Sequence, residues 1–234
     1  MSVQDIRNSL STIKNEEKAK VLQKFFKTGP GEYGEGDVFC GVRVPELRKL
    51  AKAHRLLPRK EVHELLHSRI HEERLLALFI LVDQYSRGDD KARKSIYDLY
   101  LRNIQYINNW DLVDTSALYI VGAFLLDRDK KPLYRLAKSK DLWERRIAIM
   151  STFFFIRKNR FTDTLNLSKL LLQDQEDLIH KAVGWMLREI GKRDLKTEES
   201  FLKAHYKTMP RTMLRYAIEK FPEKKRLSYL KGTI

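Results

Sequence analysis

The stretch WERRIAIMSTFF, residues 143–154, begins with charged residues and then sets a small residue, Ala148, among large apolar ones. The same order returns along the chain in segments that start 31 to 38 residues apart. This period and this pattern are typical of paired helices that stack on one another into a solenoid. The other segments are EERLLALFIL from Glu72, WDLVDTSALYIVG from Trp110, IHKAVGWMLRE from Ile179 and PRTMLRYAIEKF from Pro210.

The repeat predicts an all-α protein. We expect an α-solenoid of stacked antiparallel helix pairs, HEAT-like, in a single repeat domain over residues 1–234. The second helix of each pair is expected to present its first turn on the concave side, which would give a concave basic groove. No segment alternates with period two for long enough to make a strand. A generic α-helical bundle is the alternative.

Apolar residues recur at helical spacing along most of the chain, and small polar residues, glycine and proline mark the breaks. Gly88-Asp89 and Asn108-Asn109 are two of these breaks. Beyond Pro58 the expected helices cover 59–67, 70–87, 89–103, 110–127, 130–139, 141–158, 162–173, 176–192, 195–207, 210–220 and 222–230.

The chain carries a large excess of positive charge. Lysine and arginine number 46 against 31 aspartates and glutamates, a formal net charge of +15 in 234 residues. Such an excess indicates a polyanionic partner, and it favours nucleic acid over an acidic membrane or protein. The polar N-terminus lacks a signal sequence, and no apolar stretch is long enough to span a bilayer. We therefore expect a cytoplasmic, nucleoid-associated monomer that binds DNA and no membrane.

The sequence predicts no metal site and no cofactor. Cys40 is the single cysteine, and its place between Phe39 and Gly41 is typical of a small packing residue rather than a nucleophile. His63 and His67 have the i, i+4 spacing of a metal-binding pair, but no cluster of aspartates or cysteines accompanies them.

Residues 28–43 hold five of the ten glycines. Glycine costs about 1 kcal/mol per residue in a helix interior, so no helix is expected there. The segment lacks the GxxxxGK[ST] order of a phosphate-binding loop. Lys27 and Arg43 at its ends fit contact with a DNA backbone, and a plain connector is an equal alternative.

Charged and aromatic residues fall at the expected first turns of successive repeats. Trp110 and Asp114 are four residues apart, hence neighbours on one helix face. A carboxylate in a basic row repels phosphate, so its presence favours a reaction in which positive charge develops. Asp111 has the alternative role of a helix-start carboxylate, and Trp143 that of a core residue. The row comprises Arg74, Trp110, Asp111, Asp114, Arg145, Arg146, Lys181, Trp185, Arg188, Arg211 and Arg215.

Several of these segments resemble one known family. NNWDLVDTS, LWERRIAI and KAVGWMLRE, with the upstream GVRVPELRKLAK, are similar to motifs of the AlkD-type DNA alkylation-repair glycosylases, a HEAT-repeat family. The resemblance covers nearly the whole chain, from Phe25 to the C-terminal helices. It implies base excision repair by hydrolysis of the N-glycosidic bond of cationic N3- or N7-alkylated purines in duplex DNA. It also implies that the lesion is not flipped into a base pocket.

The resemblance implies roles for individual residues. The family's catalytic aspartate falls on Asp114, and its lesion-facing tryptophans fall on Trp110 and Trp185. Phe25 stands at the position of a family tyrosine, so a hydroxyl hydrogen bond made there is lost. Asn109 stands where family members often have the first of two adjacent tryptophans. The expected DNA-binding residues, by this match or by their charge, are Arg146, Arg188, Arg145, Lys181, Arg43, Lys27 and Phe25.

The chemistry of these side chains is consistent with the same reaction. A purine alkylated at N3 or N7 is cationic, and its departure leaves an oxocarbenium-like sugar. Asp114 could stabilise that charge and orient a water molecule, while indole rings favour a cationic nucleotide by about 0.5–2 kcal/mol each. Two other classes stay open: a non-enzymatic HEAT-repeat module that binds DNA, and a scaffold whose positive face meets an acidic protein.

Overall fold

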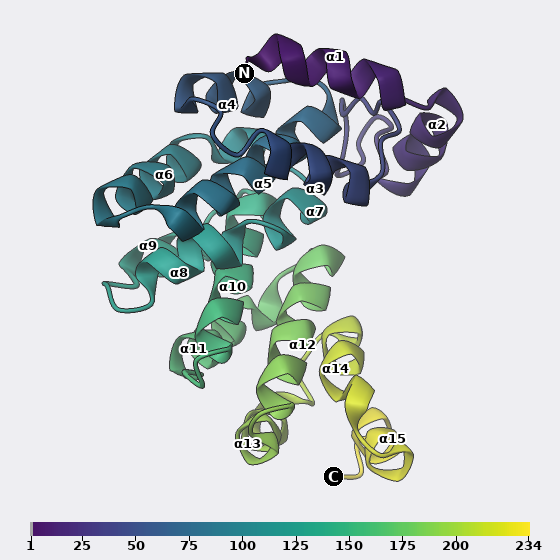
Figure 1. Cartoon of the computed structure of the whole chain (residues 1–234). Coiled ribbons are helices and arrows are strands. Elements are labelled where there is room, and N and C mark those ends of the chain that lie inside the picture. Colours follow the sequence, from purple (N-terminus) through teal and green to yellow (C-terminus); the bar gives the residue numbers. More distant parts are fainter. Residues whose placement is uncertain (1) are drawn as a thin grey trace. The chain divides into compact units, whose positions relative to one another are not determined.

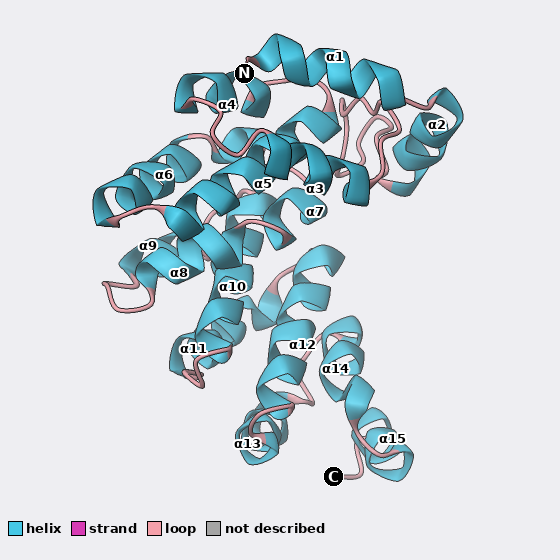
Figure 2. Cartoon of the chain, in the orientation of Figure 1, coloured by secondary structure: helices cyan, strands magenta, loops and turns pink. Residues whose placement is uncertain are grey.

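The computed structural model describes residues 2–234, and throughout this range the regular elements are helices joined by loops (Figure 2). The one strand-like feature there is an isolated parallel bridge between Val38 and Ile70. No helix in the described range is long and apolar enough to cross a membrane. The predicted all-α class is confirmed. The chain divides into two compact units, residues 1–116 and 117–234. That the two form a single repeat domain stays a prediction.

The first unit is organised around one long buried helix (Figure 1). Its elements in chain order are α1 (Val3–Ile13), α2 (Glu16–Phe25), α3 (Val44–Ala53), α4 (Arg59–Leu66), α5 (His71–Arg87), α6 (Asp90–Arg102), the 3-10 turn η1 (Ile104–Tyr106) and α7 (Trp110–Asp114). The long helix is α5, which contacts α3, α4, α6 and α7. Its apolar residues Leu76, Leu78 and Leu81 are fully buried. Each such side chain contributes about 1.5–3 kcal/mol to folding.

The first turn of α5 is unusual because its charged residues are buried as well. His71, Glu72, Glu73 and Arg74 are each less than 5% exposed. A buried charge is tolerated only when it is paired or hydrogen-bonded. The start of α5 must therefore find polar partners inside the unit.

The second unit repeats the same principle with two central helices (Figure 1). Its elements are the π-helical turn η2 (Leu118–Gly122), α8 (Ala123–Leu125), α9 (Lys131–Leu136), α10 (Leu142–Ile156), α11 (Thr162–Leu170), the 3-10 turn η3 (Leu171–Gln173), α12 (Asp177–Gly191), α13 (Leu195–His205), α14 (Arg211–Ala217), the 3-10 turn η4 (Ile218–Lys220) and α15 (Glu223–Lys231). The helix α10 contacts η2, α9, α11 and α12, and α12 in turn contacts α13 and α14. This succession confirms the predicted stacking of helix pairs.

Close packing of α12 on α14 depends on a glycine. A Cβ atom at Gly184 would lie 2.4 Å from the carbonyl oxygen of Met213, so no larger residue fits without a shift of the backbone. The motif that contains this glycine, KAVGWMLRE, also carries Trp185. Backbone contact on one side of α12 thus fixes the helix that presents the indole.

The expected helix 110–127 is interrupted, and this part of the prediction is wrong. α7 ends at Asp114 after one turn and a half, and the chain resumes as η2. The Thr115 hydroxyl donates to the carbonyl oxygen of Asp111 at 2.6 Å, and the Ser116 hydroxyl to that of Leu112 at 2.5 Å. Such back-bonding by hydroxyl side chains competes with the helical ladder. The interruption coincides with the boundary between the two units.

Candidate functional site

Trp110 lies at the start of α7 within a cluster of aromatic rings. Its ring stacks on that of Phe26, with centroids 5.1 Å apart and planes 11° apart. The Phe25 ring meets it edge-on at 6.0 Å. Trp110 is half-buried and Phe25 is 61% exposed. The cluster therefore offers solvent an aromatic surface whose inner side is fixed by packing.

Asp114 is the last residue of α7 and is half-buried. Its negative charge reaches the phenol of Tyr100, which also shares a hydrogen bond of 2.9 Å with the Ser116 hydroxyl. Burial, and after it the charge of Asp114, raise the pKa of Tyr100 against the opposing effect of the hydrogen bond. The structure thus carries Trp110 and Asp114 on one short helix, as their spacing predicts.

His71, the first residue of α5, bridges two carboxylates. Its Nδ1 lies 2.9 Å from Oδ2 of Asp37, and its Nε2 lies 2.8 Å from Oδ2 of Asp111. A neutral imidazole has one N–H donor, so both hydrogen bonds to ionised carboxylates require the imidazolium form. Burial lowers the pKa of His71, but the charges and hydrogen bonds of Asp111 and Asp37 outweigh it and raise the pKa to about 9.

Asp37 is the other centre of this cluster. Arg74 donates to its Oδ1 at 2.5 Å, and Nδ2 of Asn109 donates to its Oδ2 at 3.1 Å. Burial acts to raise the pKa of Asp37, but His71 and Arg74 hold it below its usual value. We call Asp37, His71, Arg74, Asn109 and Asp111 the buried ionic cluster.

The buried ionic cluster changes three expectations. The prediction that Arg74 presents its charge in an open row is wrong, because its guanidinium is buried against Asp37. Asp111 does accept from the amide of Leu112 in the first turn of α7, but its second oxygen holds His71. Asn109, the departure from the resembled motif, supplies both a hydrogen bond to Asp37 and the N-cap of α7.

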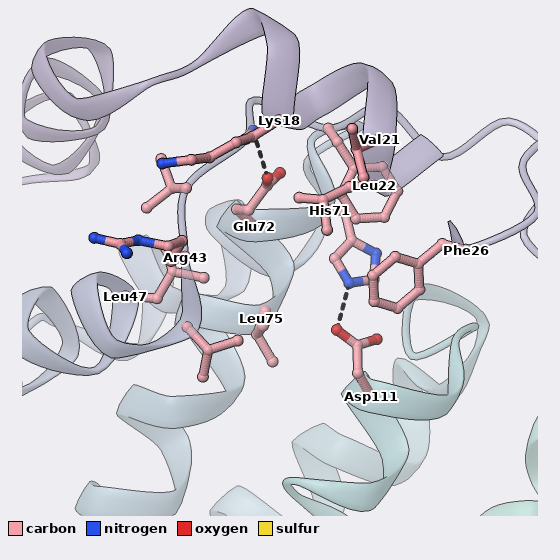
Figure 3. Close-up of a pocket in the computed structure, with 14 residues that line it drawn as sticks. Lys18, Val21, Leu22, Phe26, Arg43, Leu47, His71, Glu72, Leu75 and Asp111 are labelled. Atoms are coloured by element: carbon pink, nitrogen blue, oxygen red, sulfur yellow. Dashed lines mark hydrogen bonds and ion pairs between the residues drawn. The ribbon is translucent and has the colours of Figure 1, made fainter. Parts of the chain in front are cut away.

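An apolar cavity of about 310 Å³ adjoins the buried ionic cluster (Figure 3). Leu22, Phe26, Phe39 and Leu75 are among the residues that line it, together with the exposed cations Lys18 and Arg43. Figure 3 shows the His71 ring pointing toward Asp111.

The buried polar groups that line this cavity are already satisfied by the protein. Glu72 accepts from the backbone amides of Gly41 at 2.8 Å and Cys40 at 3.0 Å. Both ring nitrogens of His71 and both oxygens of Asp111 also have partners. Each of these groups therefore already has a hydrogen-bond partner within the protein.

In the second unit, Trp185 lies on α12 and is oriented by a carboxylate. Its Nε1 donates to Oε1 of Glu189 at 3.2 Å, and its ring centroid lies 5.8 Å from that of Phe153 on α10. Trp185 itself is half-buried. The indole is therefore held from two helices while part of it stays open to solvent.

Three arginines of the second unit have partners within the protein. Arg145 is paired with Asp174 at 2.6 Å, Arg146 is 5% exposed and donates to the carbonyl oxygen of Leu178, and Arg188 is paired with Glu219. These contacts position the guanidinium groups and partly neutralise them. Phosphate contact by Arg145, Arg146 and Arg188 stays a prediction.

Three other expected DNA-binding residues are more open. The Arg43 side chain is 66% exposed and pairs with Glu46 at 3.3 Å. Lys181 pairs with Asp177 at 2.7 Å on α12. Lys27 is exposed, with its ammonium 5.9 Å from the centroid of the Tyr33 ring. Their roles toward DNA likewise stay predictions.

The predicted site residues thus fall into two groups, one in each unit. Phe25, Trp110 and Asp114 belong to the first unit, with Lys27 and Arg43 at the two ends of the glycine-rich segment. The second group lies on α10 and α12, which contact each other. It comprises Arg145, Arg146, Lys181, Trp185 and Arg188.

The chain matches the description "DNA alkylation repair enzyme" of one protein family over residues 6–221. It belongs to that family. Two solved structures share its fold. A predicted DNA alkylation repair enzyme from Enterococcus faecalis has a TM-score of 0.68 at 18% identity, covering 90% of this chain and 97% of its own. AlkD2 from Streptococcus mutans has a TM-score of 0.56 at 19% identity, covering 89% and 99%. No curated protein matches the sequence.

For this family member, sequence reasoning missed the buried ionic cluster. The signal was present, because the run HEER at residues 71–74 places four charged or titratable residues directly before the apolar run 75–82 of the same helix. Trp143 is 7% exposed, which confirms its predicted place in the core. Among the described residues, no group of histidine, cysteine and acidic side chains is arranged to hold a metal ion.

Proposed function

We propose that this protein is a monofunctional DNA glycosylase. It hydrolyses the N-glycosidic bond of cationic N3- or N7-alkylated purines in duplex DNA, without a cofactor, as a monomer associated with chromosomal DNA. Membership of the DNA alkylation repair enzyme family and the net charge of +15 support this proposal. The observation that carries it is the pairing of a half-buried indole, Trp110, with a half-buried carboxylate, Asp114, on one short helix.

The proposed reaction needs little from the protein beyond electrostatics. The C1′–N9 bond breaks, and its electron pair leaves with the purine, which becomes neutral. The carboxylate of Asp114 stabilises the oxocarbenium-like sugar and orients a water molecule. Water adds to C1′ and loses a proton, which gives an abasic site. Trp110 and Phe25 favour the cationic lesion through their ring faces and edges.

The reaction is proposed to proceed without base flipping. An enzyme that captures an extruded base reads it with free hydrogen-bonding groups inside a pocket. The apolar cavity of the first unit has Glu72, His71 and Asp111 as its buried polar groups, and all three are occupied by protein partners. This supports a lesion that is contacted at the aromatic surface instead.

The test is release of free base from duplex DNA that contains N7-methylguanine. The wild-type protein is expected to release it, and Asp114→Asn to release it about 10²–10³ times more slowly while binding duplex DNA at least as well. Asp98→Asn, which removes a carboxylate of α6 paired with Lys94, is the matched control and keeps wild-type activity. A wild-type protein that binds duplex DNA but releases no alkylated base would instead be a non-enzymatic DNA-binding module.

A further inference from the structure

The helix α7 is too short to fix its own orientation. It has five residues, Trp110–Asp114, whereas isolated helices shorter than about 12 residues are marginal in water. The direction in which Trp110 and Asp114 point must therefore be set by the groups that contact α7. At its N-terminal end those groups belong to the buried ionic cluster.

His71 reaches Trp110 by two separate routes. The first is polar, because Nε2 of His71 holds Asp111, the residue that directly follows Trp110. The second is aromatic. The Phe26 ring lies 5.1 Å from the His71 ring on one side and 5.1 Å from the Trp110 ring on the other. A movement of the His71 ring would therefore displace the Trp110 indole both through Asp111 and through the Phe26 ring.

We propose that His71, bridging Asp37 and Asp111, is a positioning residue that fixes Trp110 and Asp114 for base release. Asp37 anchors the far side of the imidazole, and it is itself anchored by Arg74 and Asn109. Asn109 connects Asp37 directly to α7, since its side chain also accepts from the amide of Trp110 and caps the helix. The effect of His71 on base release rests on the proposed function. Its effect on the orientation of Trp110 can be measured without any activity assay.

The contact between His71 and α7 depends on a proton. The charged groups that face His71 are Asp37 from the glycine-rich segment and Asp111 from α7, with Arg74 of its own helix bound to Asp37. Glu72 is turned instead toward the amides of Cys40 and Gly41. Once the imidazolium loses a proton, one hydrogen bond becomes a contact between two lone pairs. The carboxylate that loses its hydrogen bond is either Asp111, on α7 itself, or Asp37, which holds α7 through Asn109, so either loss loosens α7.

The first test compares two histidines of the same unit. His71→Gln removes the bridge. His67→Gln is the matched control, because His67 also makes a side-chain hydrogen bond, at 2.7 Å to Asn103, and also stacks on an aromatic ring, Tyr106, at 3.9 Å. The three indole N–H resonances in a ¹H–¹⁵N spectrum, one per tryptophan, report on position. The Trp110 resonance is expected to shift in His71→Gln only. An unmoved Trp110 resonance in a folded His71→Gln protein overturns the proposal.

The second test uses the wild-type protein, so it does not depend on a variant that folds. Losing one partner of a buried ionic pair is strongly destabilising, and His71→Gln can fail for that reason alone. The Trp110 indole resonance is expected to titrate together with the His71 ring resonances, with a midpoint at a pH of about 9. The Trp143 resonance serves as the internal control. A Trp110 resonance that ignores the titration of His71 overturns the proposal.

Activity separates this proposal from the proposed function. If His71 is a positioning residue, His71→Gln lowers kcat about tenfold and leaves KM within about twofold. The variant loses the orientation of Trp110 and Asp114 rather than ground-state binding of the substrate. His67→Gln keeps wild-type values of both. If the wild-type protein releases no base, the proposed function fails, and the two resonance experiments still decide whether His71 fixes α7.

Discussion

Trp185 donates its indole N–H to Glu189, a residue one helical turn further along α12 that is 7% exposed. The same carboxylate accepts from Lys192 at 2.5 Å. Burial acts to raise the pKa of Glu189, but the hydrogen bond and charge of Lys192, then the hydrogen bond of Trp185, hold it below its usual value. An ionised, nearly buried acceptor therefore sets the plane of the indole.

Glu189→Ala is expected to lower base release by about three- to tenfold, because Trp185 loses the partner that orients it. The measurement is the single-turnover rate on a duplex with N7-methylguanine. Lys192→Ala is the control, since it removes a different partner of the carboxylate and leaves the indole hydrogen bond in place. Equal rates for Glu189→Ala and the wild-type protein would show that the indole plane does not matter.

DNA affinity is expected to fall steeply with salt and to depend on the exposed cations at the ends of the glycine-rich segment. Lys27→Ala and Arg43→Ala should each weaken binding to any duplex sequence and should each reduce the salt slope by about 0.9. Fluorescence anisotropy over a salt series measures both. Lys60→Ala, on α4, is the control for loss of one positive charge. If the salt slope is unchanged in both test variants, the glycine-rich segment 28–43 is only a connector and does not contact DNA.

Charge reversal at Arg146 or Arg188 is expected to weaken duplex binding, but these residues need a stability control because they are paired inside the protein. Thermal unfolding of each variant, measured beside its DNA affinity, separates the two effects. Loss of affinity at wild-type stability supports direct phosphate contact. Loss of both supports a structural role, in which Arg146 holds α10 to α12 and Arg188 holds α12 to η4. Unchanged affinity would mean that the two arginines do not contact DNA.

Gly41→Ala is expected to destabilise the protein far more than Gly36→Ala. Both glycines have left-handed backbone angles, with φ of +82° and +83°, so each substitution costs about 1–2 kcal/mol in conformation. At Gly36 the added Cβ would meet nothing within 4 Å, whereas at Gly41 it would lie 2.0 Å from the carbonyl oxygen of Asn15. Denaturant unfolding of both variants measures the difference. Equal losses would mean that the chain relaxes freely around Gly41.

Stability is expected to fall on the alkaline side because of His71. Its folded-state pKa of about 9 lies above the ordinary 6.5, so its contribution is complete below about pH 6.5 and is lost as the pH rises through about 9. That contribution is on the order of 3 kcal/mol, and His71→Gln should lack this pH dependence. Urea unfolding across the range measures it. If the free energy of unfolding depends on pH in the same way in the wild-type and His71→Gln proteins, His71 does not bridge the two carboxylates as described. The control variant His67→Gln should show the wild-type pH dependence.

Much of the fold could be predicted because its determinants are local. The break at Gly88-Asp89 is followed by α6, whose N-cap Asp89 accepts from the amide of Ala92. The regular period of apolar segments predicts the stacking of α10 and α12. The interruption after Asp114 escaped the prediction because Thr115 and Ser116 are tolerated inside helices. Their back-bonding depends on the local geometry of the chain.

Of the candidate site, the sequence predicted the solvent-accessible residues Trp110 and Asp114 but not the buried ionic cluster beneath them. Trp110 and Asp114 share a recognisable motif, but Asp37 lies 34 residues from His71 and 72 from Asn109. Asp37 stands in the glycine-rich segment, outside the repeated apolar segments, so the fold alone brings it to His71 and Asn109. Arg188 and Glu219 occupy the same place in two successive repeats, but the period does not indicate which side chains pair.

The brevity of α7 has a consequence for protein engineering. The motif Asn-Trp-Asp-Leu-Val-Asp at residues 109–114 contains the proposed reactive groups, yet its conformation is supplied by Asp37 and His71. Grafted alone onto another helical scaffold, the six residues would carry the right side chains in an arbitrary orientation. A transplant that functions would have to bring the loop and the buried histidine with it.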